Sequence, residues 1–330
     1  MPSSKSSEDS IHFSFKRKKS WDNDGVAATV GTILSIMVFM TFLGMFTNQY
    51  VPIWMKENES NHMNNVVGQL SNLKSGIDMQ VLNNNEQVAS APIYAPIQLH
   101  AEGVPVFASP TMGVLIFISD GPVDATGSPF FNLSYRYSVG SGASLQYYTL
   151  DKSNGGHSGG NLEFYGPNRY YVQQKVAYEN GAIILNQSDG EAVLAGYAIR
   201  IVNNGGEIDL KFTLTSLTGA SKTVGGSGTK SITSTLEYTS YEKLTNSSGG
   251  TVNLTICSKH ADAWKSYFTA LRANFESGSS ALPANYHWYV NRSASISSTE
   301  YRMLYVTIKG VDILEYTKAA ATIAMADIGV

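Results

Sequence analysis

One segment near the N-terminus constrains the fold more than any other part of the chain. The 21 residues from Val26 to Phe46 carry no charged side chain, and the nearest charges are Asp24 before them and Lys56 after them. As an α-helix this segment would be about 30 Å long, which matches the hydrocarbon thickness of a bilayer. The sequence therefore predicts one membrane-spanning helix.

The charges on the two sides of this span predict its orientation. Four consecutive cations precede it: Lys16, Arg17, Lys18 and Lys19. The other flank has only Lys56 beside Glu57 and Glu59. The positive-inside rule then places the N-terminus in the cytoplasm and the chain beyond residue 50 outside the cell. A secretory signal peptide is less favoured, because NQYVPIW after the apolar run lacks a small-x-small cleavage pattern. An uncleaved signal anchor remains an alternative.

A glycine stands at the start of the apolar segment, behind two aspartates. Asp22 and Asp24 precede Gly25, and the apolar run begins at Val26. This order of basic run, acidic residues, glycine and long apolar helix resembles the class III signal peptide of archaeal type IV pilins and archaellins. The resemblance implies that a prepilin-type peptidase cuts between Gly25 and Val26. Asp24 also suits the N-cap of a helix, since carboxylates favour helix N-termini.

The resemblance has one departure from bacterial type IV pilins. The fifth residue after the implied cut would be Val30, where the bacterial proteins carry a glutamate. Archaeal relatives often lack that glutamate, so the departure favours the archaeal branch.

A second helical pattern follows the span. After Pro52, where a break is expected, apolar residues recur at spacings of three and four. They are Met63, Val66, Val67, Leu70, Leu73 and Ile77. The pattern ends at Asn83, Asn84 and Asn85, a polar tract typical of a helix end. It predicts either a stalk that continues the span or a helix that packs in a core.

The rest of the chain alternates with the period of a β-strand. In EIDLKFTLTSL, residues 207–217, apolar residues alternate with polar ones, and the same holds around Leu133 and around Leu254. Further candidates, including the continuous run AVLAGYAIRIV, are separated by turns such as VNNGGE. Many short strands without helices between them predict a mainly antiparallel β-sandwich. One segment, 258–275, has the pattern of a helix that caps it.

Composition excludes some classes of function. The net charge is −3 and charged residues make up 15 % of the chain, which does not suit a nucleic-acid-binding protein. The single cysteine, Cys257, cannot form an intrachain disulfide. The six histidines show no metal-ligand spacing with each other or with Cys257.

Two motifs have the form of catalytic motifs but the wrong context. Residues 156–160, GHSGG, fit the nucleophile elbow around Ser158, but glycine turns flank them and no helix follows. Residues 225–231, GGSGTKS, depart from a P-loop because Thr229 separates the glycine from Lys230. Both stretches are predicted to be loops, and no catalytic residue is predicted.

Six asparagines begin an N-x-S/T sequon: Asn58, Asn132, Asn186, Asn246, Asn253 and Asn291. A chain this rich in Asn, Ser and Thr would contain several by chance. Strand alternation places Asn132 and Asn253 on the polar faces of their strands, where a glycan would fit. YENGAIILNQSDG at 178–190 and ADAWKSYF at 261–268 also resemble segments of archaeal pilin-like envelope proteins.

These features predict an α+β protein with four parts. Residues 1–25 are a basic cytoplasmic leader that is cleaved, and residues 26–82 are a transmembrane and stalk helix with a break near Pro52. Residues 83–91 are a linker, and residues 92–330 form a β-rich extracellular domain with a short capping helix.

The predicted function is structural. The chain would be a subunit or minor component of an archaeal cell-surface type IV pilus-like filament, with adhesive contacts. Its partners would be the membrane, a prepilin-type peptidase, and copies of itself or other pilins. The alternative is a non-polymerising, single-pass membrane-anchored surface protein that binds a ligand. No enzyme activity, cofactor, metal or nucleic-acid partner is predicted.

Overall fold

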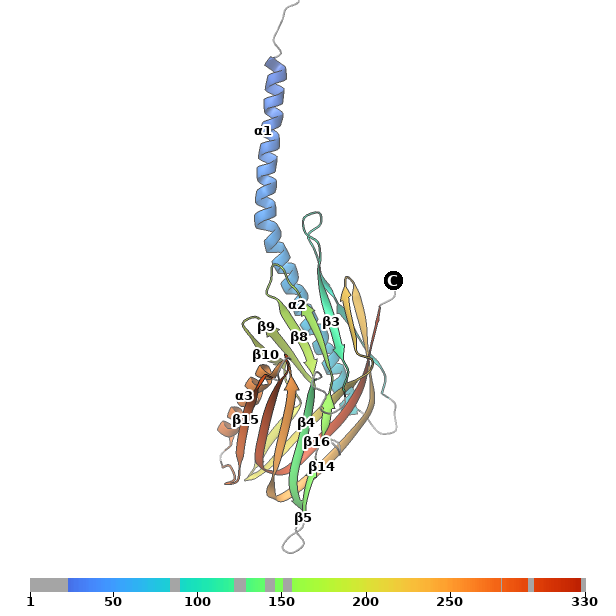
Figure 1. The fold of residues 1–330 in the computed structure, drawn as a ribbon, viewed down its shortest axis with the longest axis vertical. Helices are drawn as coiled ribbons and strands as arrows, with labels where there is room; N and C mark the ends of the chain where they lie inside the picture. The colour runs from blue at the N-terminus through green and yellow to red at the C-terminus, as the bar shows by residue number, and fades with distance from the viewer. Residues whose placement is uncertain are drawn as a thin grey trace, which may run out of the picture. The chain divides into compact units, whose positions relative to one another are not determined.

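The computed structural model describes residues 23–83, 90–121, 129–139, 146–150, 156–279, 281–295 and 300–327 (Figure 1). It divides into two compact units, Met1–Tyr50 and Val51–Val330. In the first unit, helix α1 spans Asn23–Met45 and a π-helical turn, η1, spans Phe46–Tyr50. The predicted apolar helix is therefore present.

The expected irregularity lies just before Pro52. Helix α2 spans Val51–Asn83, so Pro52 is its second residue and directly follows η1. A proline is tolerated in the first turn of a helix, but it cannot donate to the carbonyl four residues earlier and its ring crowds that carbonyl. A π-helical turn is a common way to accommodate such a conflict.

Helix α2 packs in the core of the second unit. Its predicted stripe is buried, with Val66, Leu70, Leu73 and Ile77 fully inaccessible to solvent and Met63 nearly so. These side chains contact strands of the β-sheet domain in one continuous cluster. Of the two alternatives for this segment, the structure has the core-packing helix.

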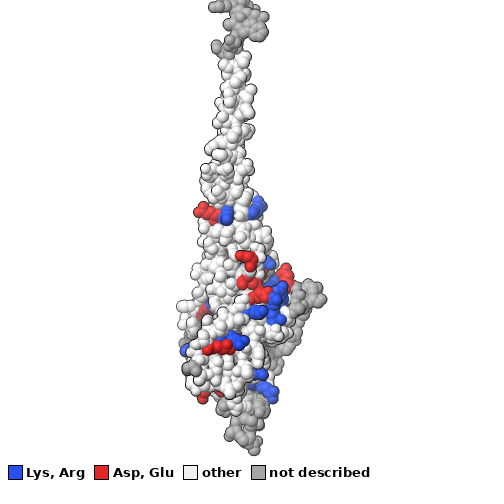
Figure 2. Space-filling model, turned by 90° about the vertical axis from the view of Figure 1, so that its left-hand side faces the viewer, with Lys and Arg blue, Asp and Glu red and all other residues white. Residues whose placement is uncertain are grey.

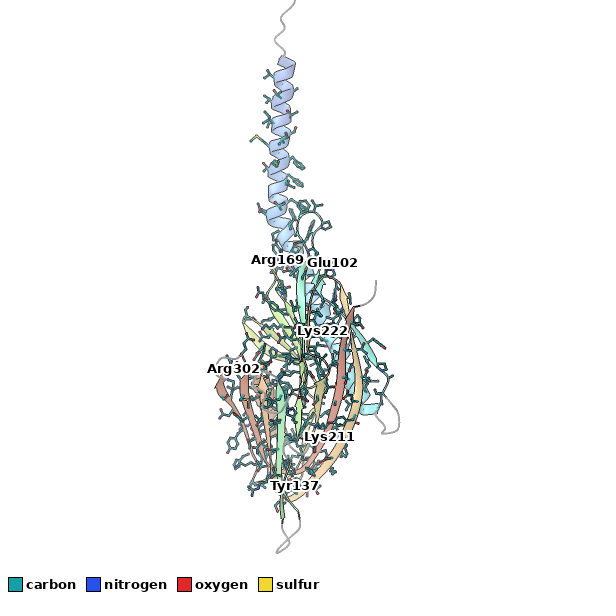
Figure 3. All side chains as sticks on the ribbon, turned by 45° about the vertical axis from the view of Figure 1, so that its right-hand side comes forward. Glu102, Tyr137, Arg169, Lys211, Lys222 and Arg302 are labelled. Carbon is teal, nitrogen blue, oxygen red and sulfur yellow. The ribbon has the colours of Figure 1, made fainter. Side chains whose placement is uncertain are left out.

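A buried carboxylate fixes α2 to the β-sheet domain. Glu59 is fully buried, and its Oε1 accepts hydrogen bonds from Thr111 Oγ1 at 2.6 Å and Arg169 N at 3.0 Å. Its Oε2 accepts from Tyr170 N at 2.8 Å and Tyr171 N at 2.7 Å. Figure 3 labels Arg169, the first of the three residues that donate their backbone N–H groups. Burial acts to raise the pKa of Glu59, but these four hydrogen bonds outweigh it and hold the pKa below the usual value.

The rest of the described chain contains sixteen strands and one further helix. The strands are β1 (Ile93–Gln98), β2 (His100–Ala101), β3 (Thr111–Ile118), β4 (Phe130–Val139), β5 (Gln146–Leu150), β6 (His157–Gly159), β7 (Asn161–Gly166), β8 (Gln174–Glu179), β9 (Ala182–Gln187), β10 (Gly190–Ala195), β11 (Ile199–Asn204), β12 (Glu207–Thr218), β13 (Lys222–Gly226), β14 (Thr229–Ser258), β15 (His287–Ser295) and β16 (Arg302–Asp327). Helix α3 spans Ala261–Gly278.

Within the described residues these strands form two sheets. The larger has nine strands in the order β11-β12-β16-β14-β4-β5, with β1, β15 and β6 paired at its sides. The smaller has seven, in the order β10-β9-β8-β7-β3-β13, with β2 beside β3. All pairs are antiparallel except β12 with β16. The fold is therefore α+β, with a long apolar N-terminal helix and a mostly antiparallel β-sheet domain, as predicted.

The smaller sheet lies between two hydrophobic cores. Leu162 and Val176 on one face belong to the cluster that contains the α2 stripe. Ala177 and Ile184 on the other face belong to a second cluster, with the larger sheet and with Trp264 of α3. The predicted short helix is present as α3, and it packs against this second core.

Strand alternation predicted the burial of individual residues correctly. In β12, Ile208, Leu210, Phe212 and Leu214 are buried and the residues between them are more exposed. The predicted VNNGGE turn joins β11 to β12 with φ of 68° at Gly205 and 105° at Gly206. Positive φ at both central residues is the type I′ geometry that favours glycine in a two-residue hairpin.

Three local predictions were wrong. Residues 157–159 of the GHSGG stretch form strand β6, since they pair with β4. Most of 225–231 lies in β13 and β14, so only the connection at 227–228 is a turn. The run AVLAGYAIRIV forms two strands, β10 and β11, that belong to different sheets. Gly159, Gly225 and Gly226 of the first two stretches pair as strand residues, which local composition could not indicate.

Candidate functional site

Helix α1 presents apolar side chains in every direction. Eleven large apolar side chains between Val26 and Met45 are 50 % to 65 % exposed: Val26, Val30, Ile33, Leu34, Ile36, Met37, Val38, Phe39, Met40, Phe42 and Met45. Five of them are consecutive, Ile36–Met40, and successive helical residues point about 100° apart, so no side of the helix is polar. Figure 2 shows no Lys, Arg, Asp or Glu along the described part of this helix on the face in view.

The hydroxyl side chains of this helix are satisfied within it. Thr29 Oγ1 donates to Val26 O at 2.9 Å, and Ser35 Oγ donates to Gly31 O at 2.8 Å. Thr32 and Thr41 donate in the same way to carbonyls three or four residues earlier, and so does Thr47 of η1. Hydroxyls bonded to their own backbone need no water, so the surface of α1 suits an apolar environment.

This helix meets the criteria for a membrane span. Within the described residues, Gly25–Asn83 is the one stretch long and apolar enough, with a mean hydropathy of 2.2 in its apolar window, none of which is buried. The finding is consistent with a single-pass anchor.

The predicted processing residues lie only partly in the described chain. Lys16, Arg17, Lys18 and Lys19 fall outside it, and Asp24, Gly25 and Val26 lie in the first turn of α1, which begins at Asn23. Cleavage after Gly25 therefore stays a prediction, and the scissile bond would be in the first helical turn before the chain enters a peptidase.

A second candidate site is a buried polar cluster around His260, just before α3. His260 Nε2 lies 3.3 Å from Glu163 Oε2, and His260 Nδ1 lies 3.3 Å from Glu191 Oε2. Ser258 Oγ donates to Glu179 Oε2 at 2.8 Å and accepts from His260 N at 2.9 Å. Strands β7, β8, β10 and β14 each contribute one of these side chains.

One carboxylate of this cluster also stabilises the start of α3. Glu191 Oε1 accepts from Asp262 N at 2.8 Å and Ala263 N at 3.0 Å. His260, at the N-cap position, makes no side-chain cap of its own. An anion at a helix N-terminus satisfies free N–H groups and interacts favourably with the helix dipole.

The pKa values in the cluster are shifted by burial and by mutual contact. Burial lowers the pKa of His260, but Glu163 and Glu191 outweigh it and raise the pKa to about 9. Burial raises the pKa of Glu179 to about 7, against the opposing effect of His260. Despite burial, His260 holds the pKa of Glu163 and of Glu191 below the usual value. At neutral pH the imidazolium therefore faces two carboxylates, with a third partly protonated.

The cluster can hold and exchange a proton, but it presents no reactive nucleophile. Ser258 is fully buried and donates to Glu179. Cys257 is also buried, and burial together with the Glu179 charge raises the pKa of its thiol to about 11. The geometry suits a structural joint that ties α3 to both sheets.

A groove of about 580 Å³ opens beside the cluster. His260 and Glu191 line it together with Lys175, Lys259, Asp189, Glu300 and Arg302. Arg302, labelled in Figure 3, pairs with Asp262 at 2.7 Å, and Lys259 pairs with Glu300 at 3.3 Å. The lining carries charges of both signs, and two of its cations are already paired, so the groove has no single charge to attract anions or cations. Its two walls come from residues 186–191 and the start of α3.

The serine of the GHSGG stretch has no catalytic partner. Ser158 is fully buried, and its Oγ donates to Asn180 Oδ1 at 3.0 Å. His157 is adjacent in strand β6, so its side chain points to the opposite face, where it contacts Asp120 and Asn132. The serine and the histidine are therefore on different sides of the strand.

The six sequons differ in exposure. Asn246 is 4 % exposed, and its Oδ1 accepts from Ser138 Oγ at 2.5 Å. Asn58, Asn132, Asn186 and Asn253 are half-buried and Asn291 is exposed. The predicted outward orientation of Asn132 and Asn253 is confirmed, because Leu133 and Leu254 beside them are in the core.

The described residues contain no group of three or more His, Cys, Asp or Glu side chains that could hold a metal ion. Comparison with protein families, with curated proteins and with solved structures finds no match to this chain. The pattern of the N-terminal residues and the surface of α1 are therefore what supports a function.

Proposed function

We propose that this chain is a subunit, or a minor component, of a cell-surface filament of the archaeal type IV pilin-like kind. One observation carries the proposal: α1 is apolar on every side, with its hydroxyls bonded to its own backbone. Such a helix suits lipid, and it can also pack against apolar helices of other subunits. The same surface can thus serve as a membrane anchor first and as a filament core afterwards.

The residues before α1 explain how the helix would change environment. Moving Lys16, Arg17, Lys18 and Lys19 into hydrocarbon would cost at least ~2.5 kcal/mol each at the bilayer centre. While they are attached, they hold the helix at the cytoplasmic face. Cleavage after Gly25 by a prepilin-type peptidase removes them and leaves Val26 as the new N-terminus, so the helix can leave the bilayer.

The β-sheet domain would then be displayed outside the cell. Exposed tyrosines on it offer adhesive contacts, since their rings bind apolar surfaces and their hydroxyls bind polar groups. They include Tyr94, Tyr238 and Tyr241. We propose a structural role without enzyme activity for this domain.

Two glycine variants test the proposal in the native host. Gly25→Leu should block processing, because a side chain would occupy the position at which the peptidase needs none. Gly31→Leu is the matched control, since Gly31 lies in the same helix with no atom within 4 Å of an added Cβ.

We expect Gly25→Leu protein to stay at precursor size in the membrane and to be absent from filaments imaged by electron microscopy. Gly31→Leu protein should be processed. Equal processing of both variants would contradict the proposal, and the membrane-anchored binding protein would replace it.

A further inference from the structure

Three of the six sequons lie on one outward face of the larger sheet. Strands β15, β16, β14 and β4 are neighbours in that order. Asn291 lies opposite Tyr305, Tyr305 opposite Thr255, and Thr255 opposite Asn132, so four strands contribute to one row. Residues paired directly across strands share a face of the sheet.

Two of these sequons face each other across one pair of strands. Asn132 lies opposite Thr255, and Ser134 lies opposite Asn253. The hydroxyl residue of each sequon is therefore beside the asparagine of the other. With strands about 4.8 Å apart, Asn132, Asn253 and Asn291 lie within roughly 15 Å of one another. We call the outward side of β15, β16, β14 and β4 that carries them the sequon face.

The amide groups of the sequon face are oriented for modification. Asn253 Oδ1 accepts from Thr307 Oγ1 at 2.8 Å, and Asn132 Oδ1 lies 2.6 Å from His157 Nδ1. In both cases the oxygen is turned toward the protein, so the nitrogen Nδ2 points away from that contact. Asn291 is exposed.

The other three sequons are less favourable. Asn58 Nδ2 donates to Glu102 O at 3.1 Å, and Asn186 Nδ2 donates to Glu191 Oε2 at 2.9 Å. In these two, the nitrogen itself is held against the protein. Asn246 is buried, and a glycan there would have to be enclosed in the fold.

A shallow groove of about 660 Å³ adjoins Asn291 on the same face. Tyr289, Tyr305, Thr307 and Lys309 line it, with Arg272 of α3 at its side. The two tyrosines are 53 % and 44 % exposed. Exposed aromatic rings with a few hydrogen-bonding groups between them suit a sugar, which has an apolar ring face and polar hydroxyls.

We propose that the sequon face is the N-glycosylated surface of this protein, with Asn132, Asn253 and Asn291 as acceptors. The first sugars on Asn291 lie in the groove against Tyr289 and Tyr305. The donor is an oligosaccharide linked through phosphate to a membrane lipid. A bond forms between Nδ2 and the anomeric carbon, the bond from that carbon to the phosphate oxygen breaks, and the Nδ2 proton leaves to a base of the transferring enzyme.

This inference rests on the proposed function in one respect, that the β-sheet domain lies outside the cytoplasm. It also adds a constraint on any filament. A face that carries three glycans cannot pack closely against another subunit, so it must point away from the filament axis.

Glycopeptide mass spectrometry of the native protein tests the proposal, with paired variants at the hydroxyl residue of each sequon. Thr255→Ala removes the sequon of Asn253, and Thr255→Ser keeps it with a comparably small change. Ser293→Ala and Ser293→Thr form the same pair for Asn291, and Ser134→Ala and Ser134→Thr for Asn132. Each alanine variant should lose one glycan from its peptide, and each partner should retain it.

The wild-type protein gives a result even where a variant does not fold. Glycans on the peptides of Asn132, Asn253 and Asn291, with an unmodified Asn246, would support the proposal. A glycan on Asn246, or unmodified peptides from the sequon face, would overturn it. If those peptides are unmodified in a protein that begins at Val26, the glycan proposal fails and the pilin proposal stands.

Discussion

Replacing Glu59 with glutamine tests how α2 is held in the β-sheet domain. The carboxylate accepts four hydrogen bonds, three of them from the backbone N–H groups of Arg169, Tyr170 and Tyr171. Glutamine has nearly the same shape, but only one of its two terminal atoms is an acceptor. The less costly orientation places the amide nitrogen at the position of Oε1, where it can donate to Thr111 Oγ1 but faces the N–H group of Arg169.

The expected loss has two parts. A hydrogen bond to a charged group contributes about 1.5–3 kcal/mol against about 0.5–1.5 kcal/mol for a neutral one, and a buried donor left without a partner costs about 1–3 kcal/mol. The unpaired N–H of Arg169 and the weaker hydrogen bonds from Tyr170 and Tyr171 should together lower the free energy of unfolding by about 3–5 kcal/mol. For a unit as large as Val51–Val330 this corresponds to a fall in Tm of roughly 6–15 °C.

Thermal and chemical unfolding of the full chain in detergent, followed by circular dichroism, measures this loss. Glu57→Gln is the matched control, because Glu57 is in the same helix and exposed. The pKa of Glu59 is lowered in the folded state, so its stabilising contribution is complete above the ordinary pKa of a glutamate. It disappears as the pH falls through the lowered value, and the wild type and Glu59→Gln should converge there. Equal stability of the two variants at pH 7, or a difference that does not change with pH, would refute the reasoning.

Three further predictions concern the β-sheet domain. The pKa of His260 is raised to about 9, so its contribution to stability is complete below about pH 6.5 and is lost as the pH rises through 9. His260→Gln should abolish this loss of stability at alkaline pH, and a variant whose unfolding free energy depends on pH as in the wild type would refute the prediction. Trp264→Ala should lower the free energy of unfolding by about 3–5 kcal/mol, because the side chain is fully buried in the second core. Lys265 is exposed, so Lys265→Ala should change that free energy by less than about 0.5 kcal/mol, and similar denaturation midpoints for the two variants would be contrary evidence. Ser158 should not react with a serine-directed phosphonate probe, since its Oγ is buried and bonded to Asn180, and labelling of Ser158 found by mass spectrometry would contradict the assignment.

Elements with a regular pattern could be predicted from the sequence. Three patterns indicate which side chains are exposed to water and which are not: the apolar run of α1, the stripe from Met63 to Ile77 and the alternation in β12. Local turn chemistry was equally informative at Gly205 and Gly206, where positive φ is required. These features depend only on near neighbours in the chain.

Features that depend on distant partners could not be predicted. Glu59 is polar in a helix with other charges, and its four donors lie at Thr111 and residues 169–171. The His260 cluster likewise gathers Glu163, Glu179 and Glu191 from three strands. A histidine directly before a helix, with glutamates in otherwise apolar strands, was the available signal. This pattern predicts a contact between the histidine and the glutamates only when the order of the strands in the sheet is known.

Mass spectrometry of the mature N-terminus, on protein purified from native membranes or filaments, tests the central claim most directly. The account predicts that the chain begins at Val26, because the peptidase removes residues 1–25 and with them the cationic cluster from Lys16 to Lys19. A chain that begins at Met1 or Pro2 would contradict the pilin proposal and leave α1 as a permanent anchor.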